Sequence, residues 1–305
     1  MRRLVRYEGG DVSELPLGKS EIIAFTARDS WSVPYGVYPS GEPWIDTASL
    51  GGPPRLLLVR PSSMTAFVAA LWYADALRER RGVQLDLFLP FVPGARQDRA
   101  NAPGPGVDYL VTAKSVAHLI NQYQFERVHI IAPHSDVAPA LIDRCQVIPM
   151  RDVLPHFPSP HDLYTGVIAP DAGATKRATD AATYYGLPLY QAWKRRDPSG
   201  GAIHGYRTEP LPTAGHFLVV DDICDGGRTF LELHGTLQRA NATADLYVAH
   251  GLFSNGTTTL LESYRHIYCT DSTVGPKDGI GVLAVCAALA SAACIPLTFH
   301  ERHAV

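Results

Sequence analysis

The segment at residues 217–230, FLVVDDICDGGRTF, contains residue types suited to binding a phosphorylated ribose. An apolar run delivers two adjacent carboxylates, Asp221 and Asp222, and the loop Asp-Gly-Gly-Arg-Thr follows at residues 225–229. Glycines let backbone amides approach a phosphate, and the amino end of a following helix adds partial positive charge. The paired carboxylates suit vicinal ribose hydroxyls, a bound Mg²⁺ or both. The simpler alternative is a strand–turn–helix whose acids only cap and whose glycines only turn.

The candidate ligands in this segment are Asp221, Asp222, Asp225, Gly226, Gly227, Arg228 and Thr229. An ordinary Asp-Gly-Gly turn carries little information, but a buried strand that ends in two acids favours the binding interpretation. The chain has no G-x-x-x-x-G-K-[ST] sequence, so the loop is not a Walker-type phosphate loop.

The elements that position these residues are predicted to alternate between strands and helices. Short apolar runs that end in polar or turn residues predict buried strands at 55–60, 85–90, 127–133, 166–171, 216–222, 244–250 and 266–271. Helix-length amphipathic stretches lie at 63–80, 108–123, 175–185 and 228–240. Such alternation is typical of α/β domains with parallel sheets, whose ligands bind at the carboxyl ends of strands. Two sets of alternation predict two tandem domains, residues 1–155 and 156–305.

The composition excludes several classes of protein. The chain has 305 residues with 27 Lys plus Arg against 30 Asp plus Glu, a net charge of −3. This balance argues against a nucleic-acid coat or a binder of anionic membranes, so no nucleic acid or membrane partner is expected. The 5 cysteines are scattered without a C-x-x-C pair, which favours reduced thiols in the cytoplasm. The apolar run 280–295 is shorter than the ~18–20 residues that span a bilayer, so we expect a buried helix there.

Five segments, in the same order along the chain, resemble the motifs of one enzyme family. They are 38–42 (YPSGE), 90–99 (PFVPGARQDR), 169–177 (APDAGATKR), 194–196 (KRR) and the phosphate loop at 221–229. They resemble the F-x-x-x-E, Y-A-R-Q-D-R, P-D-A-G-x-x-K-R and K-R-R motifs and the phosphoribosyl-pyrophosphate loop of ribose-phosphate pyrophosphokinases. The resemblance implies two tandem type I phosphoribosyltransferase-like domains, each a mainly parallel sheet flanked by helices. It also implies that the last helix packs back on the first domain.

The resemblance implies that the β,γ-diphosphate of ATP passes to the anomeric hydroxyl of ribose 5-phosphate, with Mg²⁺ as cofactor. The implied catalytic residues are Lys194 and Arg196, the ATP ligands are Arg96, Gln97, Tyr38 and Glu42, and the metal ligands are His134 and Asp171. The polar stretch 195–212 is then expected to be a mobile lid. Tyr38 and Glu42 would reach the adenine of a neighbouring subunit, which requires a homo-oligomer, a dimer or hexamer.

Three departures from the family pattern leave alternatives open. Ala132 stands where the family has an acid two residues before the metal His, which puts a second metal site in doubt. Arg228 stands where glycine is common in the loop, so the acceptor could be a larger anion such as ADP-ribose. The stretch 101–106 is less basic than in the family, which leaves control by phosphate and ADP uncertain. A phosphoribosyltransferase and an inactive regulatory subunit of synthetases are the remaining alternatives.

Overall fold

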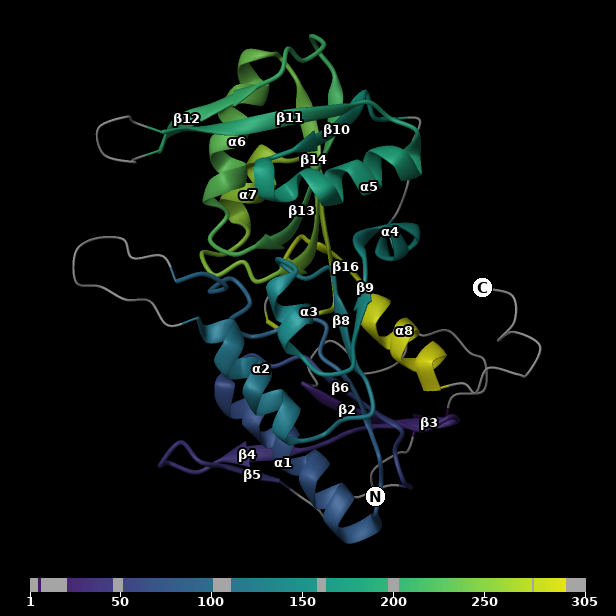
Figure 1. Ribbon diagram of the computed structural model, residues 1–305. Coiled ribbons are helices and arrows are strands. Elements are labelled where there is room, and N and C mark those ends of the chain that lie inside the picture. Colours follow the sequence, from purple (N-terminus) through teal and green to yellow (C-terminus); the bar gives the residue numbers. More distant parts are fainter. Residues whose placement is uncertain are drawn as a thin grey trace. The chain divides into compact units, whose positions relative to one another are not determined.

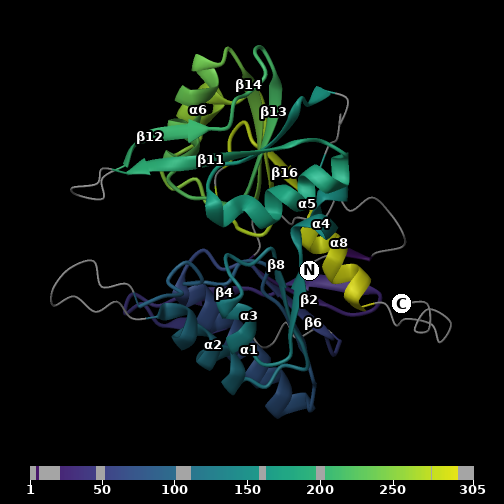
Figure 2. The ribbon, with the colours of Figure 1, turned by 45° about the horizontal axis from the view of Figure 1, so that its top comes forward.

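The structure is a computed structural model that describes residues 5–6, 21–45, 52–100, 111–157, 163–196, 203–275 and 277–294. The chain forms two compact units, each built around one seven-stranded sheet (Figures 1 and 2). The first unit contains residues 1–147, 272–274 and 284–305, and the second contains 148–271 and 275–283. Sequence patterning puts the boundary near residue 155, whereas the first segment of the first unit ends at Val147. The last helix also belongs to the first unit.

The first unit has a mixed sheet whose parallel strands are β6, β7 and β8. The strand order is β1 (Val5–Arg6), β3 (Asp29–Ser32), β2 (Ile22–Phe25), β6 (Leu56–Val59), β7 (Asp86–Phe88), β8 (Val128–Ile131) and β9 (Cys145–Ile148). The helices are α1 (Met64–Arg81), α2 (Thr112–Gln122), α3 (Val137–Leu141) and α8 (Val285–Cys294). All four residues of β6 are buried, as expected for a strand covered on both faces. A separate hairpin pairs β4 (Tyr35–Val37) with β5 (Pro43–Ile45).

The limits of α1 follow from its sequence. The Ser63 hydroxyl accepts a hydrogen bond from the Ala66 amide and caps the amino end. Gly82 ends the helix at φ 61° and donates its N–H to the Arg78 carbonyl, in a conformation that glycine adopts without strain. The buried residues of α1 belong to the core of the first unit, and α1 contacts β4, β5 and β6. Helix α8 packs against β2 and β6 of the same sheet.

The second unit has a sheet that is parallel except for one edge hairpin. The strand order is β12 (Ile203–Thr208), β11 (Leu189–Arg196), β10 (Gly166–Ala169), β13 (His216–Cys224), β14 (Thr243–Gly251), β15 (Ile267–Thr270) and β16 (Gly281–Leu283). The helices are α4 (Met150–Val153), α5 (Thr175–Tyr185), α6 (Arg228–Arg239) and α7 (Thr258–Ser263), with 3₁₀ turns η2 (Leu154–His156) and η4 (Ala172–Ala174). Helix α5 packs against β10, β11 and β13, and α6 packs against β12 and β14.

The predicted fold class is confirmed, because each predicted apolar run contains a strand and the helices lie where the amphipathic stretches are. One local prediction is wrong. The run 280–295 is not one helix, since Gly281–Leu283 forms β16 beside β15 and the helix begins at Val285. A short apolar run does not distinguish strand from helix by periodicity alone. Among the described residues, no helix is both long and apolar enough to cross a membrane.

The stretch 195–212 is expected to be a mobile lid, and its mobility stays a prediction. Its described part contains β12, which pairs antiparallel with the end of β11. Polar residues can occupy such a hairpin at the edge of a sheet, because its backbone hydrogen bonds need no apolar alternation. Residues 197–202 lie outside the described part of the chain.

Candidate functional site

Three acidic residues stand at the carboxyl ends of two adjacent parallel strands in the second unit. Ile168 of β10 lies opposite Val219 of β13, and continuing this register puts Asp171 level with Asp222. Asp221 and Asp222 lie inside β13, which continues to Cys224 and is longer than the predicted run. This is the edge of a parallel sheet at which ligands bind. The structure therefore brings Asp171 together with Asp221 and Asp222, which lie far from it in the sequence.

The acidic pair is buried, and its two carboxyl groups repel each other when both are charged. Asp221 is 9% exposed and Asp222 is 3% exposed, and the Asp222 amide donates a 2.8 Å hydrogen bond to Asp221 Oδ1. Burial raises the pKa of Asp221 well above its usual value, and the nearby charges of Asp222 and Asp171 raise it further. A group of buried carboxyls in this state gains free energy from a cation or from hydroxyl donors.

Asp171 combines a capping role with its place at the site. Its backbone is extended, and its Oδ1 accepts hydrogen bonds from the amides of Gly173 at 2.9 Å and Ala174 at 3.2 Å. These bonds cap η4, as the simpler interpretation of an acid after a strand requires. A carboxylate has two oxygens with several lone pairs, so capping through Oδ1 is compatible with metal binding by the same group.

The two glycines of the phosphate loop are required for different reasons. Gly227 has φ 77°, the left-handed region, and its carbonyl accepts the first hydrogen bonds of α6 from the amides of Phe230 and Leu231. At Gly226 an added Cβ would lie 2.9 Å from Asn255 Nδ2 and would displace the side-chain amide that donates to the Gly226 carbonyl. The loop thus runs directly into the amino end of α6, the arrangement that binds anions in proteins.

A neighbouring loop after β14 holds the phosphate loop in place. The Ser254 hydroxyl donates a 2.6 Å hydrogen bond to Asp225 Oδ1, and Asn255 Nδ2 donates to the Gly226 carbonyl at 3.2 Å. These bonds cross from the carboxyl end of one strand to that of its neighbour, because β13 and β14 pair in parallel. The loop that carries the candidate phosphate ligands is therefore braced before any ligand binds.

Arg228 is the first residue of α6, and its side chain is 74% exposed. Its Nε lies 2.6 Å from Glu232 Oε1, one turn further along the helix. The extra cation of this loop is thus partly neutralised by a neighbouring acid, and its role toward a larger acceptor stays a prediction.

Arg96 and His134 follow neighbouring parallel strands of the first unit. Arg96 and Gln97 are exposed in and just after the turn that follows β7, where the Gln97 amide donates to the Gly94 carbonyl at 2.9 Å. Thr112 Oγ1 donates to Gln97 Oε1 and ties this turn to the start of α2. His134 is exposed after β8, which pairs with β7. These side chains can therefore serve one ligand at the carboxyl edge of this sheet.

The hairpin of β4 and β5 carries Tyr38 and Glu42 in its turn. The Tyr38 amide donates a 2.9 Å hydrogen bond to the Glu42 carbonyl, and Ser40 Oγ donates to Glu42 Oε2 at 3.0 Å. The Tyr38 side chain is 54% exposed and Glu42 is exposed. Exposure is what a contact with a second copy of the chain needs, and that contact stays a prediction.

Lys194 and Arg196 lie at the end of β11, beside the strand that leads to Asp171. Gln191 of β11 lies opposite Ala169 of β10, and the backbones of Lys194 and Arg196 pair with β12 across a local bulge. Their side chains lie outside the part of the chain that the structure describes, so their proposed role stays a prediction.

The residues that the structure describes contain no group of three His, Cys, Asp or Glu side chains arranged to hold a metal ion. The predicted metal ligands, His134 and Asp171, belong to different units. Mg²⁺ commonly binds through one or two carboxylates together with substrate phosphates and water. The partly buried carboxylate of Asp171 and the buried carboxyls of Asp221 and Asp222 fit such a cation, whose positive charge would offset the repulsion that raises the pKa of Asp221.

Two buried arginines at strand ends were not predicted as site residues. Arg60 directly follows β6 and is 1% exposed, and its amide donates to the Glu21 carbonyl at 2.7 Å. Arg177, in α5, is 9% exposed and lies beside the acidic pair. The sequence signal for Arg60 is a charged residue immediately after a fully apolar strand. Arg177 is the last residue of the segment that resembles P-D-A-G-x-x-K-R, although nothing in the pattern shows which way it points.

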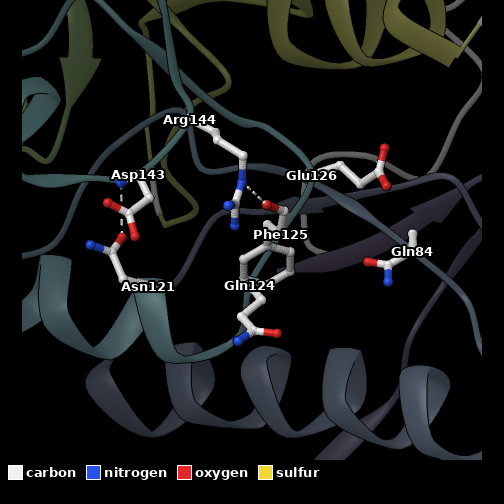
Figure 3. Close-up of a pocket in the computed structure, with 7 residues that line it drawn as sticks. All are labelled: Gln84, Asn121, Gln124, Phe125, Glu126, Asp143 and Arg144. Atoms are coloured by element: carbon white, nitrogen blue, oxygen red, sulfur yellow. Dashed lines mark hydrogen bonds between the residues drawn. The ribbon is translucent and has the colours of Figure 1, made fainter.

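A polar depression lies at the opposite edge of the first sheet and contains none of the predicted residues (Figure 3). It is lined by Gln84, Asn121, Gln124, Phe125, Glu126, Asp143 and Arg144. Gln84 and Glu126 precede β7 and β8, so the depression faces the amino ends of these strands. Two of its side chains form hydrogen bonds with nearby backbone groups. Arg144 Nε donates to the Phe125 carbonyl, and Asn121 Oδ1 accepts from the Asp143 amide. We therefore place no site there.

Comparison with curated proteins finds ribose-phosphate pyrophosphokinases. The chain is 29% identical to the ribose-phosphate pyrophosphokinase of Halobacterium salinarum over 218 residues, 69% of this chain and 74% of that protein. It is 28% identical to the putative ribose-phosphate pyrophosphokinase 2 of Streptococcus mutans over 213 residues, 65% of this chain and only 61% of that protein. No family model matches the chain.

Comparison with solved structures gives the same fold. The phosphoribosylpyrophosphate synthetase from Mycobacterium smegmatis superposes with a TM-score of 0.69, covering 86% of this chain and 88% of that chain. The two sequences are 21% identical, so this likeness concerns the fold.

Proposed function

We infer that this chain is a member of the ribose-phosphate pyrophosphokinase family and that it transfers the β,γ-diphosphate of ATP to the anomeric hydroxyl of ribose 5-phosphate. The products are phosphoribosyl pyrophosphate and AMP. The observation that carries this proposal is the buried pair Asp221–Asp222, which runs directly into a braced glycine loop at the amino end of α6. This arrangement offers acceptors for sugar hydroxyls, followed directly along the chain by hydrogen-bond donors for a phosphate.

The second unit is proposed to bind and orient the acceptor. The backbone amides of residues 226–229 and the Thr229 hydroxyl hold the 5-phosphate at the positive end of α6. Asp221 and Asp222 accept hydrogen bonds from the 2- and 3-hydroxyls and thereby fix the sugar ring. Asp171, level with Asp222, is the proposed Mg²⁺ ligand, and the cation would neutralise charge on the transferred diphosphate.

The first unit is proposed to bind ATP through Arg96 and Gln97, with His134 as a further metal ligand. A guanidinium holds phosphate oxygens by charge-assisted hydrogen bonds. In the reaction, the anomeric oxygen attacks the β-phosphorus, the bond from that phosphorus to the α,β-bridging oxygen breaks, and AMP departs. Lys194 and Arg196 are proposed to meet the charge that develops, since such transfers depend mainly on positioning and neutralisation.

Two further parts of the proposal concern assembly and location. Tyr38 and Glu42 are exposed in a hairpin turn and are proposed to contact adenine bound by a second copy, so we expect a homo-oligomer. Cys145, Cys224 and Cys269 form no disulfide, in keeping with the expected cytoplasmic location.

An acceptor with a diphosphate on its 5 position, such as ADP-ribose, is the second candidate. The observation that favours it is Arg228, an exposed guanidinium on the first residue of α6 beside the phosphate loop. A second phosphate attached to the first would lie within the reach of such a side chain, provided that it competes with Glu232 for the guanidinium.

The test is AMP release by the full chain from ATP and Mg²⁺, with ribose 5-phosphate and ADP-ribose as separate acceptors. AMP formation that depends on ribose 5-phosphate supports the main proposal, and formation only with ADP-ribose supports the second. No AMP with either acceptor contradicts both and points to the inactive regulatory subunit. Consumption of phosphoribosyl pyrophosphate with a nucleobase, without AMP release from ATP, would instead identify a phosphoribosyltransferase.

A further inference from the structure

Arg177 places a buried guanidinium beside the acidic residues of the proposed acceptor site. It lies in the first turn of α5, and its side chain is 11% exposed. Its Nη2 is 3.4 Å from Asp222 Oδ2 and its Nη1 is 3.9 Å from Asp221 Oδ1. A single cation therefore faces both members of the acidic pair.

The same guanidinium also reaches the turn that carries Asp171. Arg177 Nη1 donates a 2.7 Å hydrogen bond to the Gly173 carbonyl. The amide of Gly173 donates to Asp171 Oδ1 at 2.9 Å. Gly173 thus accepts a hydrogen bond from Arg177 and donates one to Asp171. Because Arg177 also faces Asp221 and Asp222, this one arginine links the carboxyl end of β10 with that of β13.

We propose that Arg177 is a positioning residue that fixes the acidic pair relative to Asp171, so that binding of the ribose acceptor depends on it. This inference rests on the proposed function of the site. Arg177 does not need to touch the substrate, because it acts through carboxylates that are already buried and mutually repelling. Without its guanidinium, Asp221 and Asp222 would lose the cation that both of them face, and the two hydroxyl acceptors would lose their fixed geometry.

The geometry requires arginine rather than a cation in general. A guanidinium presents five donors in a rigid planar fork, which can serve a carbonyl and two carboxylates in different directions. Lysine carries the same charge at one point on a flexible chain and cannot reproduce all three contacts. Arg177→Lys should therefore keep part of the function that Arg177→Gln loses.

The experiment measures acceptor and nucleotide affinities separately in the full chain. Initial rates of AMP release are recorded with varied acceptor at saturating ATP, and then with varied ATP at saturating acceptor. Calorimetry measures the binding of ribose 5-phosphate and of ATP with Mg²⁺ present. The variants are Arg177→Gln and Arg177→Lys. Arg239→Gln is the matched control, because Arg239 lies in α6 of the same unit and donates to Thr236, away from the strand ends.

We expect Arg177→Gln to raise KM and Kd for the acceptor about tenfold or more, the loss typical of a charged hydrogen-bond partner, with the ATP values within about twofold. Arg177→Lys should be intermediate and Arg239→Gln unchanged. Equal losses for acceptor and ATP, or no loss, overturn the inference, and so does a defect in Arg177→Lys as large as that in Arg177→Gln. If Arg177→Gln does not fold, the acceptor-to-ATP split in Arg177→Lys decides.

Failure of the inference is distinguishable from failure of the proposed function. Wild-type protein that binds ribose 5-phosphate but releases no AMP contradicts the proposed reaction, while the calorimetric comparison still decides the role of Arg177. Wild-type protein that releases AMP while the Arg177 variants keep normal acceptor affinity contradicts only the inference. Wild-type protein that binds neither acceptor contradicts both.

Discussion

Gly227 lies just before α6 and Gly235 lies inside it, and replacing each with alanine should change the free energy of unfolding in opposite directions. Gly227 has φ 77°, where a side chain costs roughly 1–2 kcal/mol of folding free energy. An added Cβ would also lie 3.1–3.3 Å from atoms of Leu260, which is 2% exposed and cannot move freely, so the contact adds to the cost. Gly227→Ala should therefore lower the free energy of unfolding.

Gly235 is the matched control because it lies in the interior of α6 with helical backbone. The nearest atom to an added Cβ is Arg239 Nη1 at 3.9 Å, an ordinary contact. Alanine there should raise the free energy of unfolding by about 0.5–1 kcal/mol, because glycine loses more backbone entropy in a helix. The two variants should thus differ by about 1.5–3 kcal/mol.

The assay is urea unfolding followed by far-ultraviolet circular dichroism, with both variants compared on the transition of the second unit. Gly227→Ala should also weaken binding of ribose 5-phosphate, because Gly227 sets the direction of the loop amides. Equal stabilities for Gly227→Ala and Gly235→Ala would refute the proposed backbone requirement. A destabilised Gly227→Ala with unchanged acceptor affinity would keep the fold argument and contradict the phosphate-loop assignment.

Three further predictions follow from the same geometry. Asp222→Asn keeps the side-chain volume but removes the charge that faces Arg177, so kcat/KM for the acceptor should fall about tenfold or more; unchanged kinetics would remove Asp222 from the site. Burial lowers the pKa of His216, despite the opposing effect of Asp245, so stability should fall as the pH drops below about 6.5; thermal melting of His216→Gln should show a weaker dependence there, and an identical profile would contradict this. Arg228→Gly should weaken activity with ADP-ribose more than with ribose 5-phosphate, and equal effects would exclude a specific role for Arg228.

The parallel core of both units could be predicted from the sequence because its strands are buried on both faces. Residues 56–59 and 217–220 are unbroken apolar runs, and both are fully buried strands. Short strands with half-exposed residues were not predictable in this way. Strands such as Tyr35–Val37 and Pro43–Ile45 are short and half exposed, and they are formed by pairing with each other rather than by a hydrophobic pattern.

The site residues that directly follow a buried strand could be predicted from the sequence. Asp171, Asp221 and Asp222 follow apolar runs, so the rule that ligands bind at the carboxyl ends of strands identified them. Arg177 was not identified, because its role depends on whether its side chain points from α5 toward β13, which follows β11 and β12 in the chain. The polar residues after Lys194 gave no sign of β12, because a hairpin at a sheet edge needs backbone pairing and little apolar surface.

The most direct test of the central claim follows the β-phosphorus of ATP. Full-length protein is incubated with Mg²⁺, ribose 5-phosphate and ATP that carries ³²P at the β position, and the products are separated by charge. The account predicts that the label leaves the nucleotide entirely and appears in phosphoribosyl pyrophosphate, with an equal amount of unlabelled AMP. Label retained in ADP, or ATP that stays intact with this acceptor and with ADP-ribose, would contradict the diphosphate transfer.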